Sequence, residues 1–262
     1  MIRSPLGLRL NPSRPMKEQV LEASHLGAKG VVVDAAGELA PERLSETGRR
    51  EVRHFLRSVA VDLIALHLPT RRPFDTADQL DERLARADRA FAMAFDLGTP
   101  LVLARVGGLP AVEETQRREL LTLALRDLGQ RADHRGVRLA LETGTEPGAD
   151  LRAFLDALAV PALAASIDPG ALLQNRHDPS ATTRALGPWV AHAYASSPDT
   201  STPSARVSLP RQSGFPPGAV DWEEYLGALE EINYRGYLTV QVSPHADPGP
   251  QFKALADLFS RF

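Results

Sequence analysis

Two acidic side chains stand at the ends of two short apolar segments. Glu142 closes the run that begins at Leu139, and Asp168 closes the run that begins at Leu163. Two carboxylates in one pocket repel each other unless a proton, an arginine or a metal ion lies between them. With a divalent cation they could polarise a sugar hydroxyl or carbonyl, and as acid and base they could move protons to and from carbon. Isomerisation and epimerisation need these two abilities and no organic cofactor.

Further polar residues recur near the ends of other apolar runs. Side chains alternate between the two faces of a strand, and the leucines of the run Leu139–Glu142 suit an outer face, which turns Ala140 and Glu142 inward. The same alternation predicts an inward ring of Arg9, Asp34, His67, Arg105, Glu142, Asp168, Tyr194 and Gln241, with His192 one layer below Tyr194. Inward polar groups cost free energy unless they are partnered. We therefore expect a ligand site, with an internal salt-bridge network such as an Arg9–Asp34 pair as the alternative.

Eight short runs must position this ring. They are rich in Val, Leu and Ile and too short for independent helices, so they are predicted to be buried strands. The runs are Leu6–Leu10, Val31–Ala35, Leu63–Leu68, Leu101–Val106, Val137–Thr143, Leu163–Asp168, Val190–Ala195 and Leu238–Ser243. Eight strands alternating with helix-like segments predict one α/β domain over residues 1–262, a closed (β/α)8 TIM barrel. An open doubly wound sheet would need an early glycine-rich phosphate loop, which is absent.

Helical spacing of apolar residues fills the intervals between the runs. It predicts helices over Met16–Leu26, Glu51–Ser58, Leu80–Leu97 and Glu113–Arg131, and Asp221 is expected to cap the last long helix. The irregular stretch 197–218 is either a functional lid or a surface loop. Since barrel enzymes build their sites at the carboxyl ends of the strands, the predicted ring lies where an active site is expected.

Composition excludes several classes of site and partner. The 262 residues carry 30 Lys and Arg against 33 Asp and Glu, a formal net charge of −3, which disfavours a nucleic-acid partner. The absence of cysteine excludes disulfides, thiolate metal sites and cysteine nucleophiles. No apolar run approaches the length of a membrane span and no secretory leader is evident, so we expect a cytoplasmic protein without membrane contact.

The order of several motifs resembles one known family. The chain is similar to the xylose-isomerase-like TIM barrels, which include sugar and sugar-phosphate isomerases, ketose 3-epimerases, inosose dehydratases and the endonuclease IV group. The similarity is strongest over Gly136–Val242 and rests on Gly136–Thr143, Ile167–Gly170, His192–Ser196, Gly218–Trp222 and Tyr234–Gln241. The endonuclease branch is disfavoured because its metal site needs more histidines than this ring contains.

The resemblance implies a divalent metal, such as Mn, Mg, Co or Zn, held by four strand-end residues. Glu142 and Asp168 retain two of those positions, whereas Tyr194 stands at the histidine position and Gln241 at the second glutamate position. The two glutamate positions, Glu142 and Gln241, are the family's acid–base pair. The residues then expected to bind substrate are Arg9, Asp34, His67, Arg105, Tyr194 and His192.

The departures from the family pattern weaken both the metal site and the usual mechanism. The amide of Gln241 cannot exchange a proton as a carboxylate does, and hard cations prefer charged oxygen ligands to a phenol. His192, His177 or His245 would have to replace the lost imidazole. Ala171 stands where the family has a substrate-contacting histidine, and Ser196-Ser197 replaces its Lys-Asp pair.

Three functional hypotheses follow. The first is a divergent sugar or sugar-phosphate isomerase or epimerase with a weakened metal site. The second is a non-catalytic carbohydrate- or polyol-binding barrel. The third is a metal-independent lyase or hydrolase that uses Glu142 as a base. All three predict a small sugar or polyol as the partner. The resemblance is compatible with a homodimer, since relatives are often dimers or tetramers, and leaves the oligomeric state open.

Overall fold

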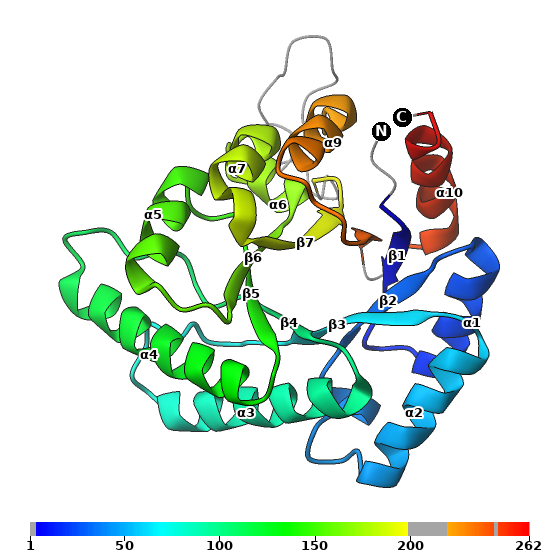
Figure 1. The fold of residues 1–262 in the computed structure, drawn as a ribbon, viewed down its shortest axis with the longest axis horizontal. Coiled ribbons are helices and arrows are strands. Elements are labelled where there is room, and N and C mark those ends of the chain that lie inside the picture. Colours follow the sequence, from blue (N-terminus) through cyan, green and yellow to red (C-terminus); the bar gives the residue numbers. More distant parts are fainter. Residues whose placement is uncertain (1–3, 199–218, 244–245, 262) are drawn as a thin grey trace.

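Eight parallel strands close into a barrel in chain order, with β8 paired to β1 (Figure 1). The computed structural model describes residues 4–198, 219–243 and 246–261. The strands are β1 (Leu6–Arg9), β2 (Gly30–Asp34), β3 (Asp62–Leu68), β4 (Leu101–Ala104), β5 (Arg138–Glu142), β6 (Leu163–Ile167), β7 (Val190–Ala195) and β8 (Leu238–Val240). Each lies on one of the eight predicted runs, so the TIM-barrel prediction is confirmed.

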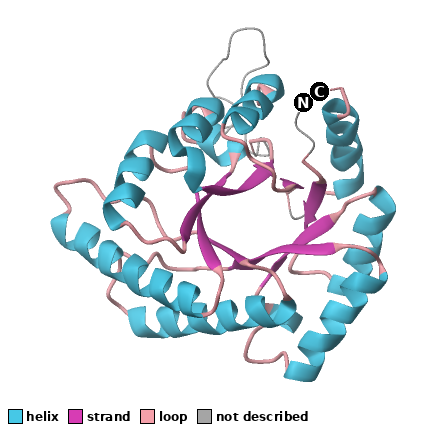
Figure 2. Ribbon diagram, viewed as in Figure 1, coloured by secondary structure: helices cyan, strands magenta, loops and turns pink. Residues whose placement is uncertain are grey.

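Helices surround the barrel on its outside (Figure 2). They are α1 (Met16–Leu26), α2 (Glu46–Ser58), α3 (Leu80–Leu97), α4 (Thr115–His134), α5 (Gly148–Leu158), α6 (Pro169–Gln174), α7 (Pro179–Leu186), α9 (Trp222–Glu231) and α10 (Pro248–Phe259). The bounds of α1 and α3 are as predicted. The helix α2 begins earlier than expected because the Ser45 hydroxyl accepts a hydrogen bond from the Gly48 N–H at 3.2 Å.

The carboxyl-terminal helices differ from the prediction. The Asp221 carboxylate caps α9 as expected, accepting from the Glu224 N–H at 3.0 Å. However, α10 follows α9 and is longer, with 12 residues against 10, so the prediction that Asp221 opens the last long helix is wrong. The described helices include none that is both long and apolar enough to cross a membrane. The cytoplasmic location stays a prediction.

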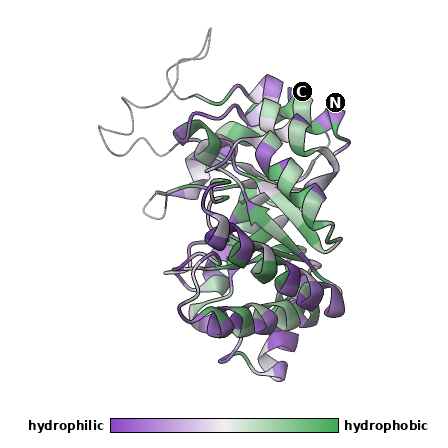
Figure 3. Cartoon of the chain, turned by 90° about the vertical axis from the view of Figure 1, so that its left-hand side faces the viewer, coloured by the Kyte–Doolittle hydropathy of each residue, from purple (hydrophilic) through white to green (hydrophobic). Residues whose placement is uncertain are grey.

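Apolar side chains separate into two cores on the two faces of the barrel wall. The larger core lies between strands and helices and includes Leu139 and Leu141, the outward leucines of β5. In Figure 3 the hydrophobic strands lie inside the more hydrophilic helix surfaces. The smaller core fills the barrel interior with Val32, Ala65, Leu101, Leu103, Ala140, Ala164 and Tyr194. Because these residues fill the interior, the other polar ring residues lie at the carboxyl ends of the strands, where the hydroxyl of Tyr194 reaches them.

One isoleucine of β3 packs against glycines of β1 and β2. The pairing of β2 with β3 shifts register between Val31 and Val32, next to Ile64. A Cβ added at Gly7 would lie 2.2 Å from Cδ1 of Ile64, and one added at Gly30 would lie 2.7 Å from its Cγ1. Real Cβ atoms essentially never approach so closely. Glycine at both positions therefore makes room for Ile64.

Substituting Gly7 tests this packing. We expect Gly7→Ala to lower the free energy of unfolding by ~1–3 kcal/mol, because it overpacks the barrel interior. Ile64→Val removes the clashing Cδ1, so Gly7→Ala should cost less in that background. Urea denaturation measures both. The control is Gly227→Ala in α9, where an added Cβ meets no atom within 4 Å; equal effects of Gly7→Ala and Gly227→Ala would contradict the packing.

Candidate active site at the mouth of the barrel

Strand ends from most of the barrel converge at one opening. Six of the predicted ring residues contact one another there: Arg9, Asp34, His67, Glu142, Tyr194 and Gln241. They come from β1, β2, β3, β5 and β7 and from the residue directly after β8. Their side chains meet because the carboxyl ends of parallel strands share one rim and the inward positions are in phase.

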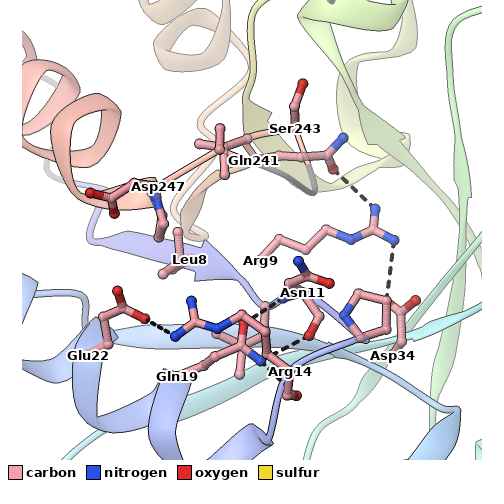
Figure 4. A pocket seen from close by; sticks show the side chains of 15 residues that line it. Leu8, Arg9, Asn11, Arg14, Gln19, Glu22, Asp34, Gln241, Ser243 and Asp247 are labelled. Atoms are coloured by element: carbon pink, nitrogen blue, oxygen red, sulfur yellow. Dashed lines mark hydrogen bonds and ion pairs between the residues drawn. The ribbon is translucent and has the colours of Figure 1, made fainter.

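The guanidinium of Arg9 lies at the centre of this group. Its Nη1 donates to Oε1 of Gln241 at 3.1 Å and to the Tyr194 hydroxyl at 3.3 Å, and lies 3.6 Å from Oε1 of Glu142. The Tyr194 hydroxyl in turn donates to the same Glu142 oxygen at 3.1 Å. Figure 4 shows the guanidinium between Gln241 and Asp34. Tyr194 thus links the positive charge of Arg9 to the carboxylate of Glu142.

The other end of the guanidinium contacts an acid and a histidine. Nη2 of Arg9 lies 3.3 Å from Oδ1 of Asp34 and 2.9 Å from Nδ1 of His67, and that nitrogen lies 3.1 Å from the same Asp34 oxygen. Whether Nδ1 donates to Asp34 or accepts from Arg9 depends on its proton. Burial lowers the pKa of His67, but Asp34 and Glu142 outweigh it and raise the pKa above its usual value.

Glu142 is the most strongly stabilised anion of the ring. Burial alone would raise its pKa, but the hydrogen bond and charge of His67 and the charges of Arg9 and Arg105 lower the pKa to about 2. The Glu142 carboxylate therefore stays ionised at neutral pH and is a weak base. The contact between Arg105 and Glu142 is loose, at 3.9 Å, and the side chain of Arg105 is 65% exposed at the rim.

Asp168 belongs to a separate part of the mouth. Its Oδ1 accepts from the Ser196 hydroxyl at 2.5 Å and, as the cap of α6, from the Ala171 N–H at 3.1 Å. The Ser196 oxygen also accepts from the Gly170 N–H at 3.1 Å. Burial raises the pKa of Asp168. Ser196, for which no role was predicted beyond replacing a family lysine, donates a hydrogen bond to Asp168 and so holds its carboxyl group.

His192 lies in a layer below the ring. Its side chain is fully buried, with Nδ1 2.8 Å from the Ser166 hydroxyl and Nε2 2.9 Å from the Thr239 hydroxyl. Burial lowers the pKa of His192 to about 3, so its imidazole is neutral. The expectation that His192 binds substrate stays a prediction. Its hydrogen-bond partners, Ser166 and Thr239, lie with it below the mouth. Strand alternation could have found Ser166 and Thr239, since each lies two residues before a ring residue.

Two cavities open on either side of Gln241. The larger, about 560 Å³, is lined by Arg9, Asp34, Gln241 and Ser243 together with residues of α1 and α10. The smaller, about 200 Å³, is lined by Arg105, Asp168, Ser196, Gln241 and Ser243. The larger is within the usual size of small-molecule sites. Both cavities reach ring residues, so a ligand in either one contacts the charged mouth.

The side chains present do not fit a divalent cation. The phenol of Tyr194 and the amide of Gln241 are neutral, and both are bonded to the Arg9 guanidinium, as is Asp34. Across residues 4–198, 219–243 and 246–261, no three His, Asp or Glu side chains are grouped so as to hold a metal ion. Hard cations take charged oxygens that can all turn to one point, and here a guanidinium occupies that point.

The histidines suggested as replacement ligands do not complete such a set. His192 is bonded on both ring nitrogens below the mouth. His177 lies in the loop between α6 and α7, and its electrostatic interaction is with Glu146. His245, and all but the first two residues of the segment 197–218, lie outside the described residues.

Comparison with known proteins places the chain in a wider group. A family model described as "Xylose isomerase-like TIM barrel" matches residues 20–261. No curated protein sequence matches the chain.

Three similar solved structures share the whole barrel. A xylose isomerase domain protein from Planctomyces limnophilus is 21% identical, with a TM-score of 0.80 over 98% of this chain and 95% of that chain. A D-allulose 3-epimerase from Methylomonas sp., in complex with D-allulose, is 16% identical, with a TM-score of 0.76 over 100% and 99%. A 3-keto-D-glucoside 4-epimerase from E. coli is 14% identical, with a TM-score of 0.75 over 98% and 100%. At these identities the likeness shows the fold alone.

Removing Arg9 tests how much the ring depends on it. We expect Arg9→Gln to lower the free energy of unfolding by ~3–5 kcal/mol, because it leaves the buried carboxylates of Asp34 and Glu142 without their cation. Arg105→Gln, at the exposed rim, should cost no more than ~1 kcal/mol. Chemical denaturation compares the two.

A double-mutant cycle separates lost pairing from lost packing. Glu142→Gln should cost less in the Arg9→Gln background than in the wild-type chain, because the buried charge that Arg9 no longer balances is then also removed. Equal costs for Arg9→Gln and Arg105→Gln, or strict additivity in the cycle, would contradict the central role of Arg9.

Proposed function

The chain belongs to the xylose isomerase-like TIM barrel family, and we propose that it binds a small sugar at the mouth of its barrel and isomerises it by proton transfer. The observation that carries the proposal is the cavity of about 560 Å³ whose wall includes the charged pair Arg9 and Asp34 and the amide of Gln241. Closely spaced donors and acceptors of this kind suit a ligand rich in hydroxyl groups.

The similar proteins support a sugar as the substrate class. Those described above include epimerases of D-allulose and of a 3-keto-glucoside. Within a shared fold, function depends on the site rather than on the fold. The two cavities that Gln241 lines supply that site. One is lined by the guanidinium of Arg9 and the other by the carboxyl group of Asp168.

Asp168 is the group best placed to move a proton. Glu142 is engaged by Arg9, Tyr194 and His67, whereas Asp168 lines a cavity, and the described residues bond its carboxyl group at Oδ1. In the proposed step the Asp168 carboxylate takes the proton from the carbon next to the sugar carbonyl, and the electron pair moves onto the carbonyl oxygen to give an enediolate. The same carboxyl then returns the proton to the neighbouring carbon while a hydroxyl proton shifts between the two oxygens.

A single proton-transferring carboxyl favours isomerisation over epimerisation. Inverting a carbon requires one group on each face of the substrate, and the second glutamate position holds Gln241, whose amide cannot exchange that proton. Moving a proton between adjacent carbons on one face needs only one such group. We therefore place aldose–ketose interconversion before 3-epimerisation among the reactions to test.

A second candidate function is sugar binding without turnover. It is favoured by the contacts of Glu142 with His67 and Arg9, which lower the pKa of Glu142 to about 2, together with the amide at position 241. Both features reduce proton transfer at Glu142 and Gln241, the two positions of the family's acid–base pair. This alternative predicts the same ligand and the same cavity, and differs only in the fate of the substrate C–H bond.

Deuterium exchange tests the proposed reaction. The protein is incubated in D2O with a panel of ketoses, aldoses and their phosphates, and NMR follows deuterium at the carbon next to the carbonyl. We expect exchange with at least one member, and Asp168→Asn should slow it by about 10²- to 10⁴-fold while binding persists.

The matched control is Asp178→Asn. Asp178 caps α7 as Asp168 caps α6, each followed by proline, and asparagine caps a helix as well as aspartate does. Asp178→Asn should leave exchange unchanged. Calorimetric binding with no exchange would select the binding alternative, and an Asp168→Asn variant that exchanges at the wild-type rate would exclude Asp168 as the base.

A further inference from the structure

Three of the four positions that the family uses for its metal point at one nitrogen of this chain. Oε1 of Gln241, the hydroxyl of Tyr194 and Oε1 of Glu142 all lie within 3.6 Å of Nη1 of Arg9. A guanidinium donates hydrogen bonds and accepts none, so a phenol and an amide oxygen suit it as partners. Tyr194 and Gln241 depart from the family pattern and weaken a metal site. In this chain both bind the guanidinium of Arg9, a cation that is part of the protein.

The fourth position, Asp168, is engaged elsewhere. Its Oδ1 accepts from the Ser196 hydroxyl and the Ala171 N–H, so that oxygen serves as a helix cap. A divalent ion at the centre of the ring would also lie beside the positive charge of Arg9, and like charges in a partly buried site repel strongly. Metal binding would require Arg9 to leave Asp34, its closest acidic partner.

We propose that the guanidinium of Arg9 is the permanent cation of this mouth and stands in place of the divalent ion, so that the protein works without a metal. Arg9 lines the 560 Å³ cavity, where it faces any ligand that fills it. Its role toward that ligand rests on the proposed function: the guanidinium stabilises the carbonyl oxygen as negative charge develops on it. The replacement of the metal itself does not depend on which sugar is bound.

Manganese titration of the wild-type protein is the first test. Bound and free Mn²⁺ are separated by electron paramagnetic resonance, with Co²⁺, Mg²⁺ and Zn²⁺ followed by calorimetry. We expect no stoichiometric ion that depends on the ring. One Mn²⁺ per chain that is lost in Glu142→Gln would overturn the proposal, whereas binding that persists in Glu142→Gln lies outside the ring and leaves the expectation met.

Restoring the family ligands tests the role of Arg9 directly. Tyr194→His with Gln241→Glu rebuilds the ligand set with the guanidinium still present, and adding Arg9→Ala removes it. We expect the triple variant to bind Mn²⁺ more tightly than the double variant by about 10- to 100-fold, the range by which groups beside the ligands alter metal affinity. Equal affinities would mean that Arg9 does not occupy the cation position. Circular dichroism checks folding, and the wild-type titration decides alone if the triple variant does not fold.

Deuterium exchange with sugars, measured with and without metal, keeps this inference distinct from the proposed function. Deuterium exchange by the wild-type protein should persist after exhaustive chelation, and exchange that appears only on adding Mn²⁺ would overturn the metal-free site. If no sugar exchanges under either condition, the proposed isomerisation fails, and the Mn²⁺ titration still decides whether Arg9 replaces the metal.

Discussion

The ion-paired guanidinium of Arg9 is the interaction on which the mouth of this barrel depends. It contacts side chains from four other strands and from the end of β8, and it lies between two buried carboxylates, Asp34 and Glu142. Buried acids are costly without a cation and inexpensive beside one that also donates hydrogen bonds. Because the partners come from separate strands, the guanidinium also fixes the strand ends relative to one another. The pKa of Glu142 is lowered first by His67 and then by the charge of Arg9.

Sequence patterns predicted the barrel well because its strands have two distinct faces. Apolar runs located every strand, and alternation turned the polar strand-end residues inward. The helices α5, α6, α7 and α10, each of which begins at a Pro or Gly, were not predicted. With 6 and 8 residues, α6 and α7 are too short for helical spacing to be recognised. The start of α2 depended on one capping hydroxyl, from Ser45, in a polar stretch.

The site was only partly predictable, because alternation gives a face and neither depth nor partner. The long side chain of Arg9 reaches the centre of the ring, whereas Arg105, beyond the end of β4, stays at the rim. Pairing of Asp168 with Ser196 links two loops far apart in the sequence and has no local pattern. Tyr194 and Gln241 seemed to be losses from a metal site. In the structure they are partners of one cation, and this gives both substitutions a common physical reason.

The most direct test of Arg9 as the built-in cation is a crystal structure of the protein grown with excess Mn²⁺, with anomalous scattering used to locate the metal. We expect the guanidinium between Glu142 and Gln241 and no anomalous peak within coordination distance of Glu142 or Asp168. A peak bonded to both carboxylates, with Arg9 turned out of the ring, would show that Arg9 does not replace the metal.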